Sequence, residues 1–152
     1  MRAVVQRVTS ASVSIDNHTV AQIGRGLLVF VGVERNDGPA DVQYVAGKIR
    51  DVRVFEDPSE PGPRLNRSVR DLGGAVLIVS QFTLAADCRK GRRPSFDRAA
   101  PPDEARPLYE AVIHDLESNG VTVAAGRFQA TMAVALVNDG PVTVLLDSRK
   151  QF

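Results

Sequence analysis

The sequence has few of the residues that build disulfide or metal frameworks. It contains one cysteine, Cys88, and two histidines, His18 and His114. A single cysteine cannot form a disulfide within the chain, which suits a reducing compartment such as the cytoplasm. The histidines stand far apart in the sequence, and no Cys or His lies at ligand spacing from Cys88, so we expect no metal site.

Long apolar runs and an excess of one charge are also missing. No stretch reaches 18 apolar residues, so no membrane span is expected, and the charged first seven residues lack the apolar stretch of a signal peptide. There are 19 basic and 18 acidic residues, for a net charge of +1. A protein that coats nucleic acid non-specifically usually carries more positive charge. Any contact with nucleic acid must come from a local patch.

The chain does have enough apolar residues for one core. With 152 residues, of which 43% are hydrophobic, it is expected to form a single domain over residues 1–152. Valine-rich, partly alternating segments predict strands at residues 3–15, 19–23, 27–33, 52–55, 75–84, 121–125, 127–138 and 142–146.

Apolar residues at helical spacing predict two main helices, over residues 42–52 and 105–116. Asn119-Gly120 should end the second, whose start is obscured by Pro107. Prolines at residues 57–64 predict an exposed loop. The sum is an α+β domain in which a curved, barrel-like sheet packs against the two helices.

Three polar residues, Ser80, Gln81 and Thr83, stand with Phe82 at the end of the most apolar strand. They can simply mark where the strand leaves the core. Alternatively, backbone N–H groups at a strand end are free to face a ligand. The segment lacks the Gly-x-Ser-x-Gly turn of α/β-hydrolases, and neither histidine is placed to partner a hydroxyl, so a Ser-His-Asp triad is not expected.

Residues 138–143 read Asn-Asp-Gly-Pro-Val-Thr. Asp-Gly and Gly-Pro are both turn signals, so residue physics alone favours a hairpin turn between two strands.

Two further segments carry alternative interpretations. Four cations surround Gly91, and they form either a solvated loop or a phosphate-binding loop. Apolar residues alternate with polar ones over residues 128–132, which predicts a half-buried strand that could also line a pocket.

Taken together, these segments resemble one family. Ser-Gln-Phe-Thr-Leu at 80–84 and Asn-Asp-Gly-Pro-Val-Thr at 138–143 are similar to the signatures of D-aminoacyl-tRNA deacylases. The similarity extends over essentially the whole chain, including the first eight residues, residues 48–50 and residues 89–96.

The resemblance implies a cofactor-free hydrolase that cuts the ester between a D-amino acid, or glycine, and tRNA, with rejection of L-aminoacyl groups. It implies a barrel-like homodimer with its active site at the subunit interface. Site residues then follow by position: catalytic Ser80, Gln81, Phe82 and Thr83; an adenosine pocket of Phe128, Gln129, Ala130 and Met132; tRNA-binding Arg89, Lys90, Arg92 and Arg93; and a cis Gly140-Pro141 pair that reaches in from the partner for chiral selection. Gln129 stands where the family usually has glycine, and the proline-rich loop is longer than usual.

Two chemical accounts follow from these residues. Backbone N–H groups near Phe82 and Thr83 suit a developing oxyanion. Either Thr83 is the nucleophile, or the 2′-hydroxyl of the terminal adenosine assists a water. We favour the second, because no adjacent residue would activate the Thr83 hydroxyl. The rival functions are a nucleic-acid-binding module without catalysis and a small cytosolic hydrolase that acts on a different ester.

Overall fold

The computed structural model describes residues 1–59 and 65–152. Its elements, in chain order, are β1 (Arg2–Ile15), β2 (His18–Ile23), β3 (Gly26–Gly32), α1 (Pro39–Asp51), β4 (Phe55–Glu56), β5 (Leu65–Arg67), α2 (Val69–Leu72), β6 (Ala75–Ser80), the 3₁₀ turn η1 (Phe82–Ala85), α3 (Pro102–Ser118), β7 (Thr122–Ala125) and β8 (Ala133–Asp147).

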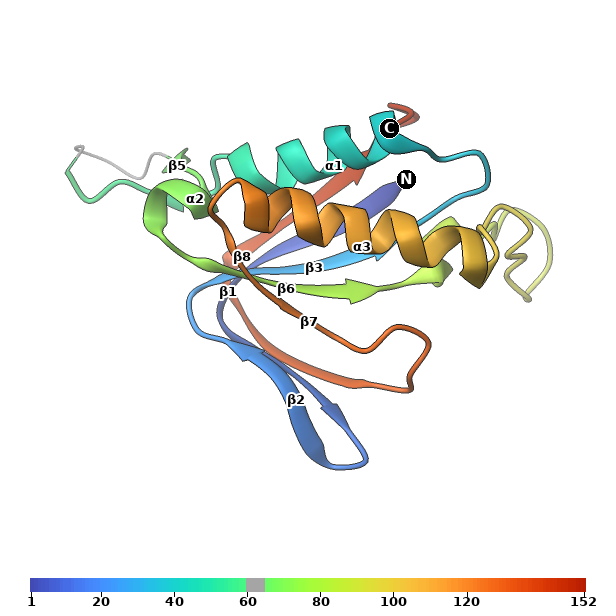
Figure 1. The fold of residues 1–152 in the computed structure, drawn as a ribbon, viewed down its shortest axis with the longest axis horizontal. Helices are drawn as coiled ribbons and strands as arrows, with labels where there is room; N and C mark the ends of the chain where they lie inside the picture. The colour runs from blue at the N-terminus through green and yellow to red at the C-terminus, as the bar shows by residue number, and fades with distance from the viewer. Residues whose placement is uncertain (60–64) are drawn as a thin grey trace.

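The sheet is organised around β1. One edge of β1 pairs antiparallel with β3 over residues 2–8 and then with β2 over residues 11–15. Its other edge pairs antiparallel with β8 along nearly its whole length. Beyond β3 the sheet continues with β6 and β7 as parallel strands. The sheet therefore curves back on itself, and the expected barrel-like α+β architecture is confirmed (Figure 1).

Two apolar clusters fill the fold. The larger lies between the sheet and the helices α1 and α3, which run over the same face of the sheet (Figure 1). The smaller lies on the opposite face, inside the curve of the sheet, around Val8, Leu28 and Leu77. Burying each such side chain stabilises the folded state by about 1.5–3 kcal/mol, so burial on both faces stabilises β3 and β6 strongly.

The two main helices are confirmed, and local chemistry sets their ends. At the start of α1, Pro39 occupies the first turn and the Asp41 carboxylate accepts the Gly38 N–H at 2.9 Å. Helix α3 starts at Pro102, so Pro107 lies inside it, and Gly120 follows its end with a φ of 81°. The short α2 was not expected from the sequence.

The predicted hairpin at residues 138–143 is wrong. Ala133–Asp147 is one strand that runs through this segment. Strand β1 offers a partner along its whole length, from Ser14 opposite Ala133 to Arg2 opposite Asp147. The extra residues are absorbed by register shifts near Val8 instead of by a chain reversal.

Three other boundaries differ from expectation. The strand expected over residues 75–84 ends at Ser80, where the chain turns into η1. Residues 127–132, expected as strand, form a loop with Gln129 at a φ of 62°. The strand expected over residues 52–55 is reduced to β4.

The proline-rich segment at 57–64 is described only through residue 59. That part is a turn in which Asp57 accepts the Ser59 N–H at 3.0 Å, and residues 60–64 lie outside the described residues. Among the helices described, none combines the length and apolarity needed to cross a bilayer.

Candidate active site

A pocket of about 570 Å³ lies at the carboxyl ends of the parallel strands β3, β6 and β7. In open parallel sheets this edge is where ligands bind, because the chain leaves each strand there with free backbone groups. Its lining is mainly apolar and comprises Val33, Val79, Ser80, Gln81, Phe82, Ala100, Pro102, Ala105, Phe128, Gln129, Ala130, Met132 and Val134. Seven of the eight residues expected for catalysis and adenosine binding are thus brought together, and Thr83 lies next to them in sequence.

The turn after β6 presents backbone donors. The Gln81 N–H still donates to the Val31 carbonyl at 2.8 Å, as a continuation of the sheet. The next amides, of Phe82 and Thr83, open η1 and have no hydrogen-bond partner among the described residues. Phe82 lines the pocket and Thr83 follows it in the sequence, so two adjacent N–H groups of the kind that can stabilise an oxyanion occur beside the pocket.

The Thr83 hydroxyl has a donor beside it, and no base is placed next to it within residues 1–59 and 65–152. The Gln81 side-chain amide donates a hydrogen bond to Thr83 Oγ1. Neither histidine supplies a base here. His18, on β2, contacts the Asp16 carbonyl, and His114, on α3, contacts Ser118.

Gly32 allows the turn to lie against the sheet. A Cβ placed on Gly32 would meet the Gln81 carbonyl oxygen at 2.8 Å and Leu84 Cβ at 2.9 Å. Only glycine fits this close approach, so the end of β3 sets the position of residues 81–84. Sequence reasoning missed this role, although Gly32 ends an apolar run in a way typical of a close backbone approach.

Phe128 forms the opposite wall. Its ring contacts Tyr109 with centroids 5.8 Å apart, and the Arg106 guanidinium lies 4.9 Å from its centre. The Tyr109 hydroxyl donates to the Ile78 carbonyl at 3.1 Å, and burial, with some help from Glu110, raises the pKa of that phenol above its ordinary value. The wall is therefore anchored in the core by a neutral phenol.

Gly140 and Pro141 do not line the described pocket. They lie in the middle of β8, where both are exposed, and the peptide bond between them is cis, as the resemblance implies. Arg7 connects this segment to the residues before β4. Its Nε lies 3.1 Å from Asp139 Oδ2, and its Nη1 donates to the Val54 carbonyl at 2.6 Å.

The basic loop is closed at its base by Asp87 and Ser95, whose backbones exchange hydrogen bonds of 2.8 and 3.0 Å. Arg89, Lys90, Arg92 and Arg93 are all exposed on it. Arg89 is tied to Asp87 at 2.5 Å, and its side chain and backbone N–H hold the pKa of that carboxyl well below its ordinary value. The other three make no ion pair within the described chain.

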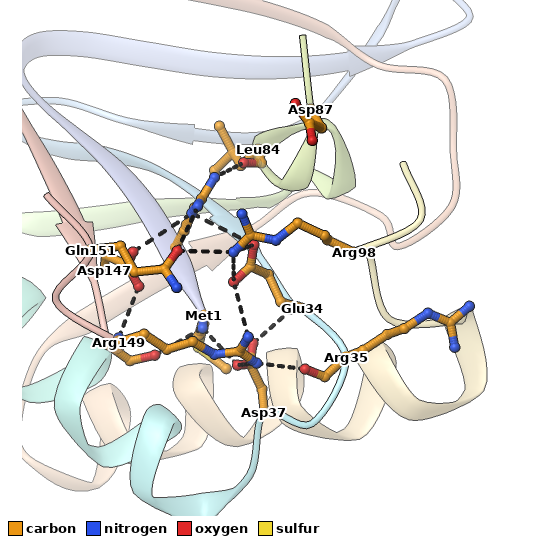
Figure 2. A network of polar contacts seen from close by, with 12 residues as sticks. Met1, Glu34, Arg35, Asp37, Leu84, Asp87, Arg98, Asp147, Arg149 and Gln151 are labelled. Carbon is orange, nitrogen blue, oxygen red and sulfur yellow. Dashed lines mark hydrogen bonds and ion pairs between the residues drawn. The ribbon is translucent and has the colours of Figure 1, made fainter. Parts of the chain in front are cut away.

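A buried acidic hub lies beneath η1. Glu34 is 1% exposed and faces three guanidinium groups, those of Arg98 at 3.0 Å, Arg2 at 3.6 Å and Arg149 at 3.7 Å. Arg2 also donates to the Leu84 carbonyl at 3.1 Å. Figure 2 shows Arg98 and Arg149 converging on Glu34, with Leu84 nearby. The hub ties the turn to the chain's first strand, and no motif in the sequence indicates it.

A family model described as D-Tyr-tRNA(Tyr) deacylase matches residues 4–147. The chain belongs to the D-aminoacyl-tRNA deacylase family. Among curated proteins named D-aminoacyl-tRNA deacylase, that of Syntrophotalea carbinolica is 60% identical over 152 residues, with all of both chains covered. That of Heliobacterium modesticaldum is 57% identical over 149 residues, covering 98% of this chain and 97% of the relative.

Solved structures agree on the fold of this deacylase family member. A protein titled c-Myc DNA Unwinding Element Binding Protein superposes with a TM-score of 0.91 at 39% identity, covering 97% of this chain and 98% of that one. A probable eukaryotic D-amino acid tRNA deacylase gives a TM-score of 0.77 at 19% identity, covering 95% and 97%, and shows the shared fold alone.

Family membership makes the chain a hydrolase. It thereby decides against the alternative of a nucleic-acid-binding module without catalysis.

Proposed function

We propose that this hydrolase cleaves the ester that joins a D-amino acid, or glycine, to the terminal adenosine of tRNA, and releases the free amino acid and tRNA. The observation that carries the proposal is the pocket in which Ser80, Gln81 and Phe82 face Phe128 and Ala130, in a chain whose relatives carry the name D-aminoacyl-tRNA deacylase. The reaction is expected to need no metal or cofactor and to take place in the cytoplasm.

The terminal adenosine would occupy the apolar part of the pocket. Its base would lie among Phe128, Gln129, Ala130 and Met132, which all contribute to the lining. A half-exposed aromatic ring anchored by Tyr109 is a suitable stacking surface for an unpaired base. This placement would bring the ester at the ribose to the turn at residues 80–83.

Hydrolysis would then proceed through backbone donors and the substrate's own hydroxyl. Water attacks the ester carbonyl, and the amides of Phe82 and Thr83 stabilise the oxyanion; one such donor is worth roughly 10²–10³ in rate. The adenosine 2′-hydroxyl assists the water. The contact of Thr83 Oγ1 with the Gln81 side-chain amide supports this account, because an amide is not a base that would activate the hydroxyl.

The site would be completed by a second copy of the chain. Gly140 and Pro141 lie outside their own pocket, on the outward face of β8. That face is largely apolar: Val137 is 56% exposed and Leu145 is 59% exposed, with small residues between them. A continuous apolar sheet face of this kind is typical of a surface that another protein covers. We propose a homodimer in which each Gly140-Pro141 pair enters the partner's pocket.

Chiral selection would then occur at the α-carbon. A pocket that recognised side chains would discriminate among D-amino acids, since each apolar mismatch costs about 1–3 kcal/mol. A rigid Gly-Pro pair can instead exclude any side chain that points the wrong way, because proline fixes its own φ and glycine permits close approach. Glycine has no side chain, so this steric exclusion cannot reject it. Glycyl-tRNA should therefore be cleaved, and L-aminoacyl-tRNA spared.

The deciding experiment compares matched D-, L- and glycyl-tRNAs as substrates of the pure protein in chelator. The proposal expects release of D-amino acid and glycine with intact L-aminoacyl-tRNA. Rapid cleavage of simple esters without a tRNA end would favour the rival hydrolase. Equal cleavage of D- and L-aminoacyl-tRNA would refute the selection account while leaving the activity in place.

A further inference from the structure

Two exposed phenylalanines form a pair at the mouth of the pocket. Phe82 is 56% exposed and Phe96 is 38% exposed. Their ring centroids lie 5.1 Å apart with the planes at 67°, an edge-to-face arrangement. Such a pair leaves ring faces uncovered, because only one face of one ring meets the other's edge. The two rings therefore present aromatic faces that a ligand can reach.

The pair is next to two hollows. Phe82 lines the pocket described above. The residues before and after Phe96, Ser95 and Asp97, both line a second hollow together with Asp87, Arg89, Lys90 and Arg93. The aromatic pair therefore adjoins both the pocket and the basic loop.

The position of Phe96 is fixed by its backbone. The mutual hydrogen bonds of Asp87 and Ser95 clamp the residue before it, and its own carbonyl accepts the Ala99 N–H at 2.9 Å. The backbone that carries the ring is therefore held before any ligand arrives, and the ring itself rests against Phe82, which lowers the entropic cost of binding on it.

The cations nearby are available for phosphate. Lys90 and Arg93 border the second hollow, and neither forms an ion pair in the part of the chain that the structure describes. Arg89 is neutralised by Asp87, and Asp97 is hydrogen-bonded by Ser95 Oγ at 2.8 Å. A flat apolar surface flanked by unpaired cations is the combination that binds single-stranded nucleic acid.

We propose that Phe96, together with Phe82, is a stacking platform for the unpaired nucleotide that precedes the terminal adenosine, whose phosphate is held by Lys90 and Arg93. This inference rests on the proposed function and adds a subsite to it. It explains how a small apolar pocket can distinguish the end of a nucleic acid from a lone aminoacyl-nucleoside: the platform supplies affinity for the next nucleotide without contacting the ester.

The test compares D-aminoacyl-tRNA with D-aminoacyl-adenosine, which lacks the preceding nucleotide together with the rest of the tRNA. With D-aminoacyl-tRNA, Phe96→Ala and Phe96→Leu should each raise KM roughly tenfold, the effect of removing one stacked base, with kcat little changed. With D-aminoacyl-adenosine, which lacks the preceding nucleotide, neither variant should change kcat/KM. Phe96→Leu keeps an apolar contact with Phe82 but has no flat face, and Phe96→Trp should retain wild-type KM.

Leu65→Ala is the matched control, since Leu65 is an exposed apolar residue (43%) that lines neither hollow. A second arm uses D-aminoacyl-tRNA with an abasic site before the terminal adenosine; the wild type should then show the KM of Phe96→Ala.

If the Phe96 variants lose kcat/KM equally on both substrates, Phe96 only supports the turn. If they lose kcat/KM on neither substrate, the two rings do not bind the nucleotide. Either outcome would overturn the proposed platform and leave the proposed function standing. Failure of the wild type to cleave either substrate would overturn the proposed function, and the platform with it.

Discussion

At the scale of single residues, Thr83 separates the two chemical accounts. If backbone amides stabilise the oxyanion and the substrate's hydroxyl assists the water, the Thr83 side chain contributes only position. Thr83→Ala should then keep measurable activity, with kcat lowered about tenfold or less through looser packing of the turn. Single-turnover kinetics on D-aminoacyl-tRNA measure this directly. An acyl group trapped on Thr83, or loss of all turnover in a folded variant that still binds tRNA, would establish Thr83 as the nucleophile.

Gly32 sets the position of the same turn because it has no side chain to push the turn away. Gly32→Ala would place a methyl group 2.8 Å from the Gln81 carbonyl oxygen, so the turn must shift. Overpacking of this kind costs about 1–3 kcal/mol of unfolding free energy, and we expect kcat to fall more than tenfold because the two amides move with the turn.

Gly24→Ala is the control for this change, since a Cβ there meets nothing within 4 Å. Denaturant unfolding and kcat should both be near wild type for Gly24→Ala. Unchanged kcat in Gly32→Ala would show that the turn tolerates displacement and that its amides are not positioned by β3.

The Asp41 carboxylate should make stability depend on pH at the acid end. Burial opposes its charge, but hydrogen bonds from Ser148 and the Gly38 N–H, with the charges of the N-terminal amine and Arg149, outweigh burial and hold its pKa below 3.8. A depressed pKa stabilises the folded state above about pH 4, and this contribution is lost as pH falls through the folded pKa.

Asp41→Asn removes that titration. At neutral pH it should lower the unfolding free energy by about 0.3–1 kcal/mol, through loss of the acid at the start of α1. As the pH falls below about 4, its stability should decrease less steeply than that of the wild type. Parallel curves for the two proteins in this window would contradict the assignment.

At the scale of elements, the basic loop should supply affinity and not chirality. Lys90→Ala with Arg93→Ala should raise KM for D-aminoacyl-tRNA roughly tenfold and reduce the slope of log KM against log salt by about 1.5, because two phosphate contacts are lost. The ratio of D to L cleavage should stay constant.

Lys48→Ala with Arg53→Ala removes the same charge from exposed positions that line neither hollow. This pair should leave the salt slope near wild type. An unchanged slope in the loop variant would mean that the loop is only a solvated surface.

Some helices and strands could be predicted from sequence patterns, and others could not. Both main helices and the buried strands β3 and β6 could be predicted, because their apolar spacing reports burial directly. Strand β8 could not be. Asp139-Gly140-Pro141 has the local chemistry of a turn, but whether the chain reverses depends on β1, more than a hundred residues away in the sequence. Likewise, the end of β6 at Ser80 reflects the close approach at Gly32, which no local pattern contains.

Some residues of the candidate site could likewise be predicted from the sequence, and others could not. The strand-end cluster at residues 80–83 and the lining at 128–132 could be identified from motifs and family resemblance. The acidic hub around Glu34 could not, because its charges come from both ends of the chain and meet only in the folded protein.

At the scale of the whole molecule, the proposed composite site, in which each Gly140-Pro141 pair enters the partner's pocket, predicts complementation between two inactive subunits. Ala130→Trp should fill the pocket, and Gly140→Ala should distort the partner's contribution, since its φ is 116° and a Cβ there meets Arg7 Nη2 at 2.8 Å. Each variant alone should be inactive. Co-refolded in equal amounts, they should recover about a quarter of wild-type activity, because half of the dimers carry one intact site of two.

Mixing the folded homodimers without subunit exchange serves as the control and should restore nothing. If the pocket used its own Gly140-Pro141 pair, no mixture would contain an intact site, and activity would stay at background even after co-refolding.

The pairing of β1 with β8 has a consequence for how the chain is made. Strand β1 is synthesised first among the elements and β8 last, yet β8 pairs with β1 along nearly its whole length. While the ribosome is still translating the middle of the chain, one edge of β1 remains without its native partner. Contacts between such distant segments close slowly, and an open strand edge invites pairing with other chains. The nascent protein is therefore most exposed to aggregation until residues 133–147 emerge, and the sheet can close only after β8 has been synthesised.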